Sequence, residues 1–367
     1  MSSRLKSFTS WERPKRTAYN AVLARMRSEA DYHLASFFRA KEFVRLQPPI
    51  LTSSDCEGAG EVFTVSTNAR DTAGLTVGRG NGERDEEFFK SSKYLTVSAQ
   101  LHLEAFVHEH PSVWTLSPTF RAEKSDTPRH VSEFWMLEAE VRTELLDDIM
   151  DLVEDMIRTL VYGLQSSSIL VDLAAARGKA TRTPDDSTLS CLEERWKRLL
   201  RPSWPRLTYE EAIKKLQTAV KTGQASFNYA PSWDAGLHLE HEKWIASEIG
   251  LGSPVFVTHY PASIKPFYML PSVDSFQPQN SACNTVACFD LLLPEACEIV
   301  GGSMREHRPE HLLRAMKDKE ISPSNLDWYL DLRRYGSVPH GGFGLGFDRL
   351  LGYLANIENI KDVSWAL

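Results

Sequence analysis

Several residues in two distant parts of the chain have the side chains needed to bind a nucleoside triphosphate. They are Arg121, Glu123, Arg129, His130, Phe134 and Arg349. Guanidinium groups bind phosphate through paired hydrogen bonds of fixed geometry, and an aromatic ring can stack on a base. Arginines on both sides of a triphosphate would stabilise the negative charge that develops at the α-phosphorus during adenylyl transfer. The pattern therefore predicts a site in which ATP activates a carboxylate.

A glycine-rich stretch, residues 341–346, comes shortly before Arg349. It lacks the GxGxxG spacing of a dinucleotide-binding loop and the GK[ST] ending of a phosphate-binding loop. Two interpretations remain: a strand whose glycines admit a neighbouring backbone, or a strand without side chains that forms a floor under a nucleotide. We favour the second, because a helix that begins at Phe347 would then present Arg349 to the same site.

The elements that must position these residues are predicted from apolar periodicity. Three- and four-residue steps predict long helices over residues 16–41 and 147–164. Thr208 and Glu211 predict a helix that starts with a capping box. The polar residues 178–187 are predicted to form a loop. Strands are predicted at residues 61–66, 93–97, 113–121, 134–143, 255–259, 267–270, 286–292 and 297–301.

Strand-rich blocks are separated by helices without a regular βαβ alternation. This order predicts an α+β fold with a mainly antiparallel sheet flanked by helices. No linker divides the chain, so we predict an N-terminal lead over residues 1–15 and one catalytic domain over residues 16–367. Within that domain, we interpret residues 178–205 as a variable insert.

The composition excludes several classes of protein. The chain has 42% hydrophobic and 25% charged residues, typical of a globular enzyme, and no apolar run long enough to cross a bilayer. Its formal net charge of −7 gives no overall basic surface for a nucleic acid. The five cysteines are odd in number and have no CxxC spacing, which argues against a disulfide scaffold or a zinc site. We therefore predict a cytoplasmic protein, with organellar import as the alternative because residues 1–16 are rich in basic side chains.

Three motifs, in the expected order, resemble those of the class II aminoacyl-tRNA synthetases. Residues 38–51 are similar to motif 1, which builds the dimer interface in that family, residues 120–134 to motif 2, and residues 340–349 to motif 3. The match is closest to the catalytic domain of the asparaginyl-tRNA synthetases, in class IIb, and extends over residues 16–364. The segments that make the resemblance specific to this group are residues 52–61, 94–101, 298–305 and 329–336. The resemblance implies a homodimer.

The resemblance also implies a role for each residue of the nucleotide site. Arg121 would hold the α-phosphate, and Arg349 would clamp the triphosphate from the opposite side. These two are the predicted catalytic residues. His130, or Arg129 beside it, would reach the γ-phosphate, and Phe134 would stack on adenine.

Acidic residues complete the ATP-binding set that the resemblance implies. Glu123 and Glu298 would belong to it, and Glu298 would share a Mg²⁺ ion with Asp290. Carboxylates suit Mg²⁺, which bridges phosphate oxygens and keeps several water ligands. Magnesium is therefore the predicted cofactor, and ATP the predicted co-substrate.

The amino-acid substrate is argued from charge at the positions that the resemblance identifies. Glu57 and Gln100 would receive the substrate ammonium group. Arg305 would donate to a side-chain carbonyl oxygen, and Glu138 would accept from a side-chain NH₂. Aspartyl relatives carry a lysine where this chain has Leu103. A cation and an anion at the two ends of a primary amide favour L-asparagine, since a wrong partner leaves a buried group unpaired. L-Aspartate stays open, because one branch of this group activates aspartate to make asparagine.

Four residues depart from the family pattern, and their effect on specificity is left open: Ala99, Cys288, Cys297 and Met304. The family has an OB-fold anticodon-binding domain before the catalytic domain, whereas the first predicted helix here starts at residue 16, so we expect that domain to be absent. Three hypotheses follow: a synthetase that charges tRNA, a tRNA-independent ligase with a small-molecule acceptor, and a catalytically silent paralogue that binds nucleotide or a regulatory partner. The intact Arg121 and Arg349 argue against the third.

Overall fold

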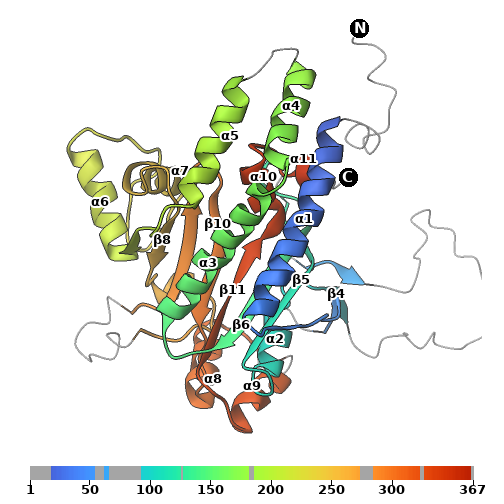
Figure 1. Ribbon diagram of the computed structural model, residues 1–367. Coiled ribbons are helices and arrows are strands. Elements are labelled where there is room, and N and C mark those ends of the chain that lie inside the picture. Colours follow the sequence, from blue (N-terminus) through green and yellow to red (C-terminus); the bar gives the residue numbers. More distant parts are fainter. Residues whose placement is uncertain are drawn as a thin grey trace, which may run out of the picture.

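The computed structural model describes residues 18–53, 62–65, 92–124, 127–181, 186–272, 284–322 and 326–364. Within these residues an eight-stranded sheet runs in the order β1-β5-β6-β11-β10-β9-β8-β7 (Figure 1). Its strands are β1 (Val44–Arg45), β5 (Ser112–Phe120), β6 (Glu133–Arg142), β7 (Arg206–Thr208), β8 (Val255–Thr258), β9 (Cys288–Leu293), β10 (Cys297–Met304) and β11 (His340–Gly346). Only the outer pairs β1–β5 and β7–β8 are parallel among these described strands. The predicted α+β fold with a mainly antiparallel sheet is confirmed.

Four long helices pack together beside the sheet (Figure 1). They are α1 (Ala18–Ala40), α3 (Leu146–Gln165), α4 (Ile169–Thr181) and α5 (Asp186–Leu199). Helix α3 lies directly on β10 and β11. The Ile149 side chain comes within 2.4 Å of where a Cβ on Gly341 would lie, so α3 and β11 approach closely there. Apolar side chains from α1, α3 and the sheet form the largest buried cluster, which fixes the position of the central strands.

The other described elements surround the ends of the sheet. They are β2 (Leu51–Thr52), β3 (Thr64–Val65), β4 (Lys93–Leu95), α2 (Gln100–Phe106), α6 (Tyr209–Lys221), α7 (Leu239–Trp244), α8 (Pro309–Asp318), α9 (Asp327–Arg334), α10 (Phe347–Leu354), α11 (Lys361–Ser364), a π-helical turn at Ile245–Ile249 and a 3₁₀ turn at Ala262–Ile264. Strands β2, β4 and β3 form a small separate sheet. Helices α2, α8 and α9 lie together at the bottom of Figure 1. Helix α2 contacts both β6 and α9.

Most elements predicted from periodicity are confirmed. Helices α1 and α3 match the two long predicted helices. At the start of α6, Thr208 Oγ1 accepts from the Glu211 amide at 3.2 Å, and the Glu211 carboxylate accepts from the Thr208 amide at 2.8 Å, so the predicted capping box is present. The glycine-rich stretch is strand β11, and α10 begins at Phe347 as predicted.

Two predictions are wrong. Residues 178–181 and 186–187 are helical, because α4 continues to Thr181 and α5 starts at Asp186. Their composition did not exclude helix, since Lys179 and Ala180 are strong helix formers and Asp186 suits the first turn of a helix. Residues 267–270 form no strand; Met269 makes an isolated bridge to Arg305. Pro266 has no amide hydrogen to donate, and the Met269 amide turns back to the Pro266 carbonyl.

Glu57 and the N-terminal lead lie outside the described residues. Among the residues that are described, no single helix combines the length and apolar composition needed to cross a membrane. Helices α3 and α4 meet that criterion only as a pair, across a bend of 72°.

Candidate active site

One cavity of about 280 Å³ brings the sequence-predicted residues together. Its walls include every predicted site residue that the structure describes: Gln100, Arg121, Glu123, Arg129, His130, Phe134, Glu138, Asp290, Glu298, Arg305 and Arg349. These residues come from α2, β6, β9, β10, α10 and the connection between β5 and β6, except for Arg305, which directly follows β10. These residues are far apart in sequence. The antiparallel sheet brings them together, because its strands β9, β10, β11 and β6 lie side by side.

Glycines keep part of the cavity wall free of side chains. Gly344 on β11 pairs with Glu138 on β6. A Cβ on Gly344 would lie 3.3 Å from the Met136 sulfur and point toward the cavity. On β10, a Cβ on Gly301 would lie 3.2 Å from Glu298 Oε1 and 3.6 Å from Asp290 Oδ1. Side chains at these glycines would fill space beside the polar residues, which agrees with the predicted glycine floor.

Arg121 follows β5 directly, and its backbone is held by a hydrogen bond from its amide to the Ser132 carbonyl at 3.0 Å. Its guanidinium carbon lies 5.7 Å from the centre of the Phe134 ring. Glu123 links two of the other predicted residues, since its carboxylate lies 3.7 Å from Arg121 Nη1 and 3.4 Å from His130 Nε2. The predicted phosphate-binding arginine and the predicted base-stacking ring are therefore neighbours.

Arg349 projects from the first turn of α10 and is fixed by a hydrogen bond from Nη1 to the Glu298 carbonyl at 2.7 Å. Arg129 is fixed in a similar way, since its Nη2 donates to the Ala296 carbonyl at 2.8 Å. The pKa of Arg349 is lowered, first by burial and then by the positive charges of Arg129 and Arg121. Arginines that repel one another at a cavity wall form a site that an anion would stabilise.

Two carboxylates, Asp290 and Glu298, line the same cavity as the arginines. The pKa of Glu298 is raised, first by the negative charge of Asp290 and then by burial. Both carboxylates lie within reach of one point above Gly301, as the distances to a Cβ there show. Among the described residues no group of three potential metal ligands occurs. Two carboxylates nevertheless fit Mg²⁺, because this ion takes its remaining ligands from phosphate oxygens and water.

Lys265 is a cavity residue that the sequence did not identify. Its Nζ lies 2.8 and 2.7 Å from the two oxygens of Asp290 and 4.0 Å from the centre of the Tyr260 ring. Burial alone would lower the pKa of Lys265, but the Asp290 carboxylate outweighs it, and the pKa is raised. The only sequence signal was a single lysine next to Pro266, just before the stretch predicted to be a strand.

Glu242 is a second residue that sequence reasoning missed. It comes from α7, and its carboxylate accepts from the Glu298 amide at 3.4 Å. Burial, followed by the charges of Glu298 and Asp290, raises the pKa of Glu242 to about 7. A single glutamate on a short helix carries no pattern, so nothing in the sequence placed it near the predicted metal ligands.

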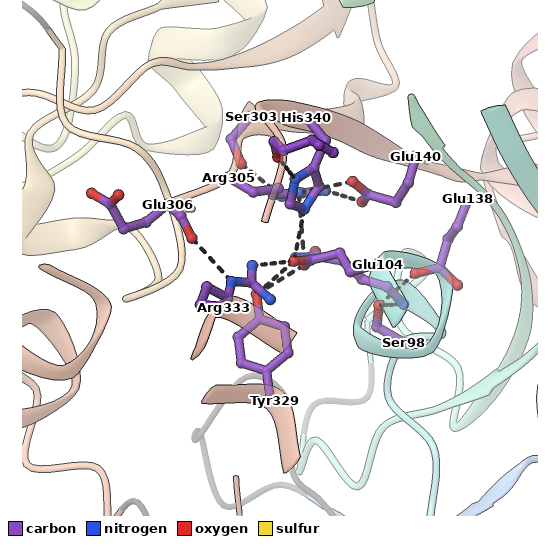
Figure 2. Close-up of polar contacts among 12 residues, drawn as sticks. Ser98, Glu104, Glu138, Glu140, Ser303, Arg305, Glu306, Tyr329, Arg333 and His340 are labelled. Atoms are coloured by element: carbon purple, nitrogen blue, oxygen red, sulfur yellow. Dashed lines mark hydrogen bonds and ion pairs between the residues drawn. The ribbon is translucent and has the colours of Figure 1, made fainter. Parts of the chain in front are cut away.

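Glu138 and Arg305, two of the residues predicted to bind the amino acid, are held by other parts of the protein. Glu138 accepts from the Ser98 hydroxyl and from the Ala99 amide, the latter at 2.9 Å. Arg305 donates from Nη2 to Glu140 at 2.6 Å, from Nε to the same carboxylate at 3.3 Å, and from Nη1 to Ser303 at 2.6 Å (Figure 2). Their side chains are almost fully buried. Fixed opposite charges are therefore in place before any substrate arrives.

The four departures from the family pattern are buried residues. Ala99 supplies the amide that binds Glu138. Cys288 and Met304 belong to hydrophobic clusters, and Cys297 is buried at the start of β10. None of the four lines the cavity.

Comparisons with known proteins agree with this geometry. Residues 10–365 match the family model described as tRNA synthetases class II (D, K and N). The chain is 42% identical to the mitochondrial asparagine–tRNA ligase of Saccharomyces cerevisiae, over 95% of this chain and 68% of that protein. It is 40% identical to the asparagine–tRNA ligase of Clostridium tetani, over 96% and 71%. The asparaginyl-tRNA synthetase of Pyrococcus horikoshii complexed with asparaginyl-adenylate superposes with a TM-score of 0.74 at 31% identity, over 96% of this chain and 69% of that one.

Proposed function

The chain belongs to the class II tRNA synthetases of the D, K and N group, and from this premise we propose that it transfers the adenylyl group of ATP to the carboxylate of L-asparagine. The products of this first step are asparaginyl-AMP and pyrophosphate. We propose tRNA as the acceptor of the activated asparagine in a second step, as the names of the relatives indicate for those proteins. A small-molecule acceptor remains the alternative hypothesis.

The observation that carries the proposal is the shared cavity of Arg121, Arg349 and Arg305. Adenylyl transfer requires a substrate carboxylate oxygen to lie next to the α-phosphorus, opposite the bond to the leaving pyrophosphate. Binding both reactants in one cavity supplies that proximity. Arg121 would stabilise the charge at the α-phosphorus. Arg349, with Arg129 or His130, would hold the phosphates that leave as pyrophosphate.

We propose asparagine as the amino acid because the charges at the far end of the cavity are opposite. Arg305 would donate to the amide oxygen, and Glu138 would accept from the amide NH₂. Gln100 and Glu57 would bind the ammonium group, with Glu57 outside the described residues. An aspartate side chain would place a second carboxylate near Glu138, which costs electrostatic energy in a buried site.

Asp290 and Glu298 would hold Mg²⁺ in this proposal. A bound Mg²⁺ would supply positive charge that offsets the charge of the phosphates. Asp290 also accepts from Lys265 in this structure, so this carboxylate already has one cationic partner.

We also propose that residues 16–367 form one catalytic domain and that two copies associate through the helix predicted over residues 16–41 and the Pro48–Pro49 segment. Apolar side chains exposed there support the dimer: Tyr32, Val44, Ile50 and Leu51. Exposed apolar residues that gather on one segment are typical of an interface. Sedimentation of the purified protein at micromolar concentration tests this; a monomer would contradict it.

Pyrophosphate exchange into ATP, measured with each of the twenty amino acids, tests the first step. We expect exchange with asparagine at least tenfold above exchange with aspartate. Absence of exchange with both would overturn the proposal. Charging of total tRNA tests the second step, since a tRNA-independent ligase would show exchange without charging. Fractionation of cells that express the full chain would distinguish the predicted cytoplasmic location from organellar import.

A further inference from the structure

The buried carboxylate of Glu104 lies between Arg333 and Arg305, and Arg305 lines the cavity (Figure 2). Glu104 belongs to α2, one turn after Gln100, and has no exposed surface. It is not part of the cavity wall, so it is not a candidate to touch substrate. A carboxylate removed from water requires hydrogen-bond donors or cations to compensate for the lost hydration. The donors around Glu104 indicate its role.

Four side chains donate to Glu104, and they come from three elements. The Gln100 amide nitrogen Nε2 lies 2.9 Å from Oε1. The Tyr329 hydroxyl lies 3.0 Å from Oε1 and 2.8 Å from Oε2. The contacts to Oε2 are completed by Arg333 of α9 and by His340 Nε2 of β11, the latter at 3.1 Å. Figure 2 shows Arg333, Tyr329 and His340 converging on this one carboxylate.

These partners keep Glu104 ionised and immobile. Burial alone would raise the pKa of Glu104, but the charge of Arg333, the hydrogen bond from His340 and the charge of Arg305 outweigh it, and the pKa lies well below its ordinary value. An ionised carboxylate accepts hydrogen bonds and cannot donate them. The group of Gln100 that faces Glu104 must therefore be its NH₂.

We infer that Glu104 is a positioning residue that holds the Gln100 carboxamide with its carbonyl oxygen toward the cavity, so that this wall presents an acceptor to the substrate ammonium group. The inference rests on the proposed function, in which Gln100 binds that ammonium. Without an anionic neighbour, the two ends of a carboxamide are nearly equal in shape, and rotation about the terminal torsion is soft. The reversed amide would turn two donors toward the ammonium, which itself only donates.

The substitution E104Q tests this role, because the new side chain can either donate or accept. Two ligands are compared: asparagine, and succinamic acid, which lacks the ammonium group. We expect the preference of the wild-type protein for asparagine over succinamic acid to fall at least tenfold in E104Q, with the KM for ATP within about twofold. E104D is the companion variant, since it keeps the charge for Arg333 but shortens the reach to Gln100.

A matched control and a double variant separate positioning from general damage. Y329F removes a different donor from the same carboxylate and should leave the preference unchanged. In a Q100A background, E104Q should alter the preference by less than about twofold, because the residue through which it acts is gone. Equal losses for both ligands in E104Q, or additive effects of E104Q and Q100A, would overturn the inference.

A measurement on the unaltered protein covers the case in which these variants fail to fold. In a crystal structure with asparagine bound, the ammonium nitrogen should lie within about 3.2 Å of the Gln100 amide atom that faces away from Glu104. A separation beyond about 4 Å would overturn the inference. Pyrophosphate exchange by the wild-type protein is the separate test of the proposed function: exchange with asparagine together with an unchanged preference in E104Q would defeat the role of Glu104 alone.

Discussion

Arg27 of α1 forms an ion pair with Asp348, the residue that precedes Arg349 on α10. The second oxygen of Asp348 accepts from the Trp135 amide of β6 at 2.7 Å. The Asp348 carboxylate is fully buried, and the Arg27 guanidinium carbon also lies 5.2 Å from the centre of the Phe347 ring. One buried carboxylate thus joins α1, β6 and the start of α10 directly beside the arginine proposed to clamp the triphosphate.

Arg27→Met should destabilise the protein by about 3 kcal/mol, because it leaves the Asp348 carboxylate buried without its cation. The free energy of unfolding from urea titration measures the loss. The KM for ATP should also rise in pyrophosphate exchange, since Asp348 adjoins Arg349.

The double variant Arg27→Met with Asp348→Asn is the control for this prediction. Asparagine carries no charge to leave unpaired, so the double variant should recover most of the lost stability. Equal instability in the single and double variants would show that the ion pair is not the cause.

Arg121→Ala should reduce pyrophosphate exchange by roughly a hundredfold or more while the melting temperature changes little. The side chain is only partly buried, so the fold depends on it less than the chemistry does. Arg334→Ala is a suitable control, because its ion pair with Asp331 is exposed on α9. Near-normal exchange in a folded Arg121→Ala variant would show that the α-phosphate binds elsewhere.

Glu138→Gln should lower the preference for asparagine over aspartate by about tenfold or more, because the charge that repels a carboxylate substrate is removed. The ratio of kcat/KM values in exchange measures it. Glu133→Gln, at the exposed end of the same strand, should leave the ratio unchanged. If both variants keep the wild-type ratio, the electrostatic account of selectivity fails.

Glu242→Gln should remove a pH dependence of stability. The pKa of Glu242 is raised to about 7 in the folded protein from an ordinary value of 4.5. Since the folded state holds this proton more tightly, its contribution to stability is full below pH 4.5 and is lost as pH rises through 7.

The loss amounts to about 3 kcal/mol for the metal-free protein. We therefore expect Glu242→Gln to raise the melting temperature in EDTA more at pH 8 than at pH 5. The exposed Glu248→Gln provides the comparison. A stabilisation that is equal at both pH values would contradict the prediction.

Thr208→Ala should destabilise the protein by about 1 kcal/mol, because it removes the hydroxyl that accepts from the Glu211 amide. Thr218→Ala, at an exposed position in the last turn of the same helix, should have no cost, since alanine is the better helix former. Thermal or urea unfolding of both variants measures the two changes in stability. A cost no larger for Thr208 than for Thr218 would mean that the cap contributes nothing.

The local features of the fold were readable from the sequence. The capping box at Thr208, the helix that begins at Phe347 and the strand over the glycine-rich residues 341–346 each depend on a pattern within a few residues. The errors arose where local pattern was ambiguous. Polar residues 178–181 are compatible with both loop and helix, and the apolar run after Pro266 is compatible with a strand until its backbone partners are known.

The sequence by itself determined which functional groups are present and in what order, because motif spacing and side-chain chemistry are properties of the chain. The tertiary structure decided which of them meet. Lys265 reaches Asp290, Glu242 reaches Glu298, and Glu104 is enclosed by Arg333 and His340 only after strands and helices pack across long sequence separations. Burial then sets the charge states of these groups, and a buried charge depends on partners that no local pattern specifies.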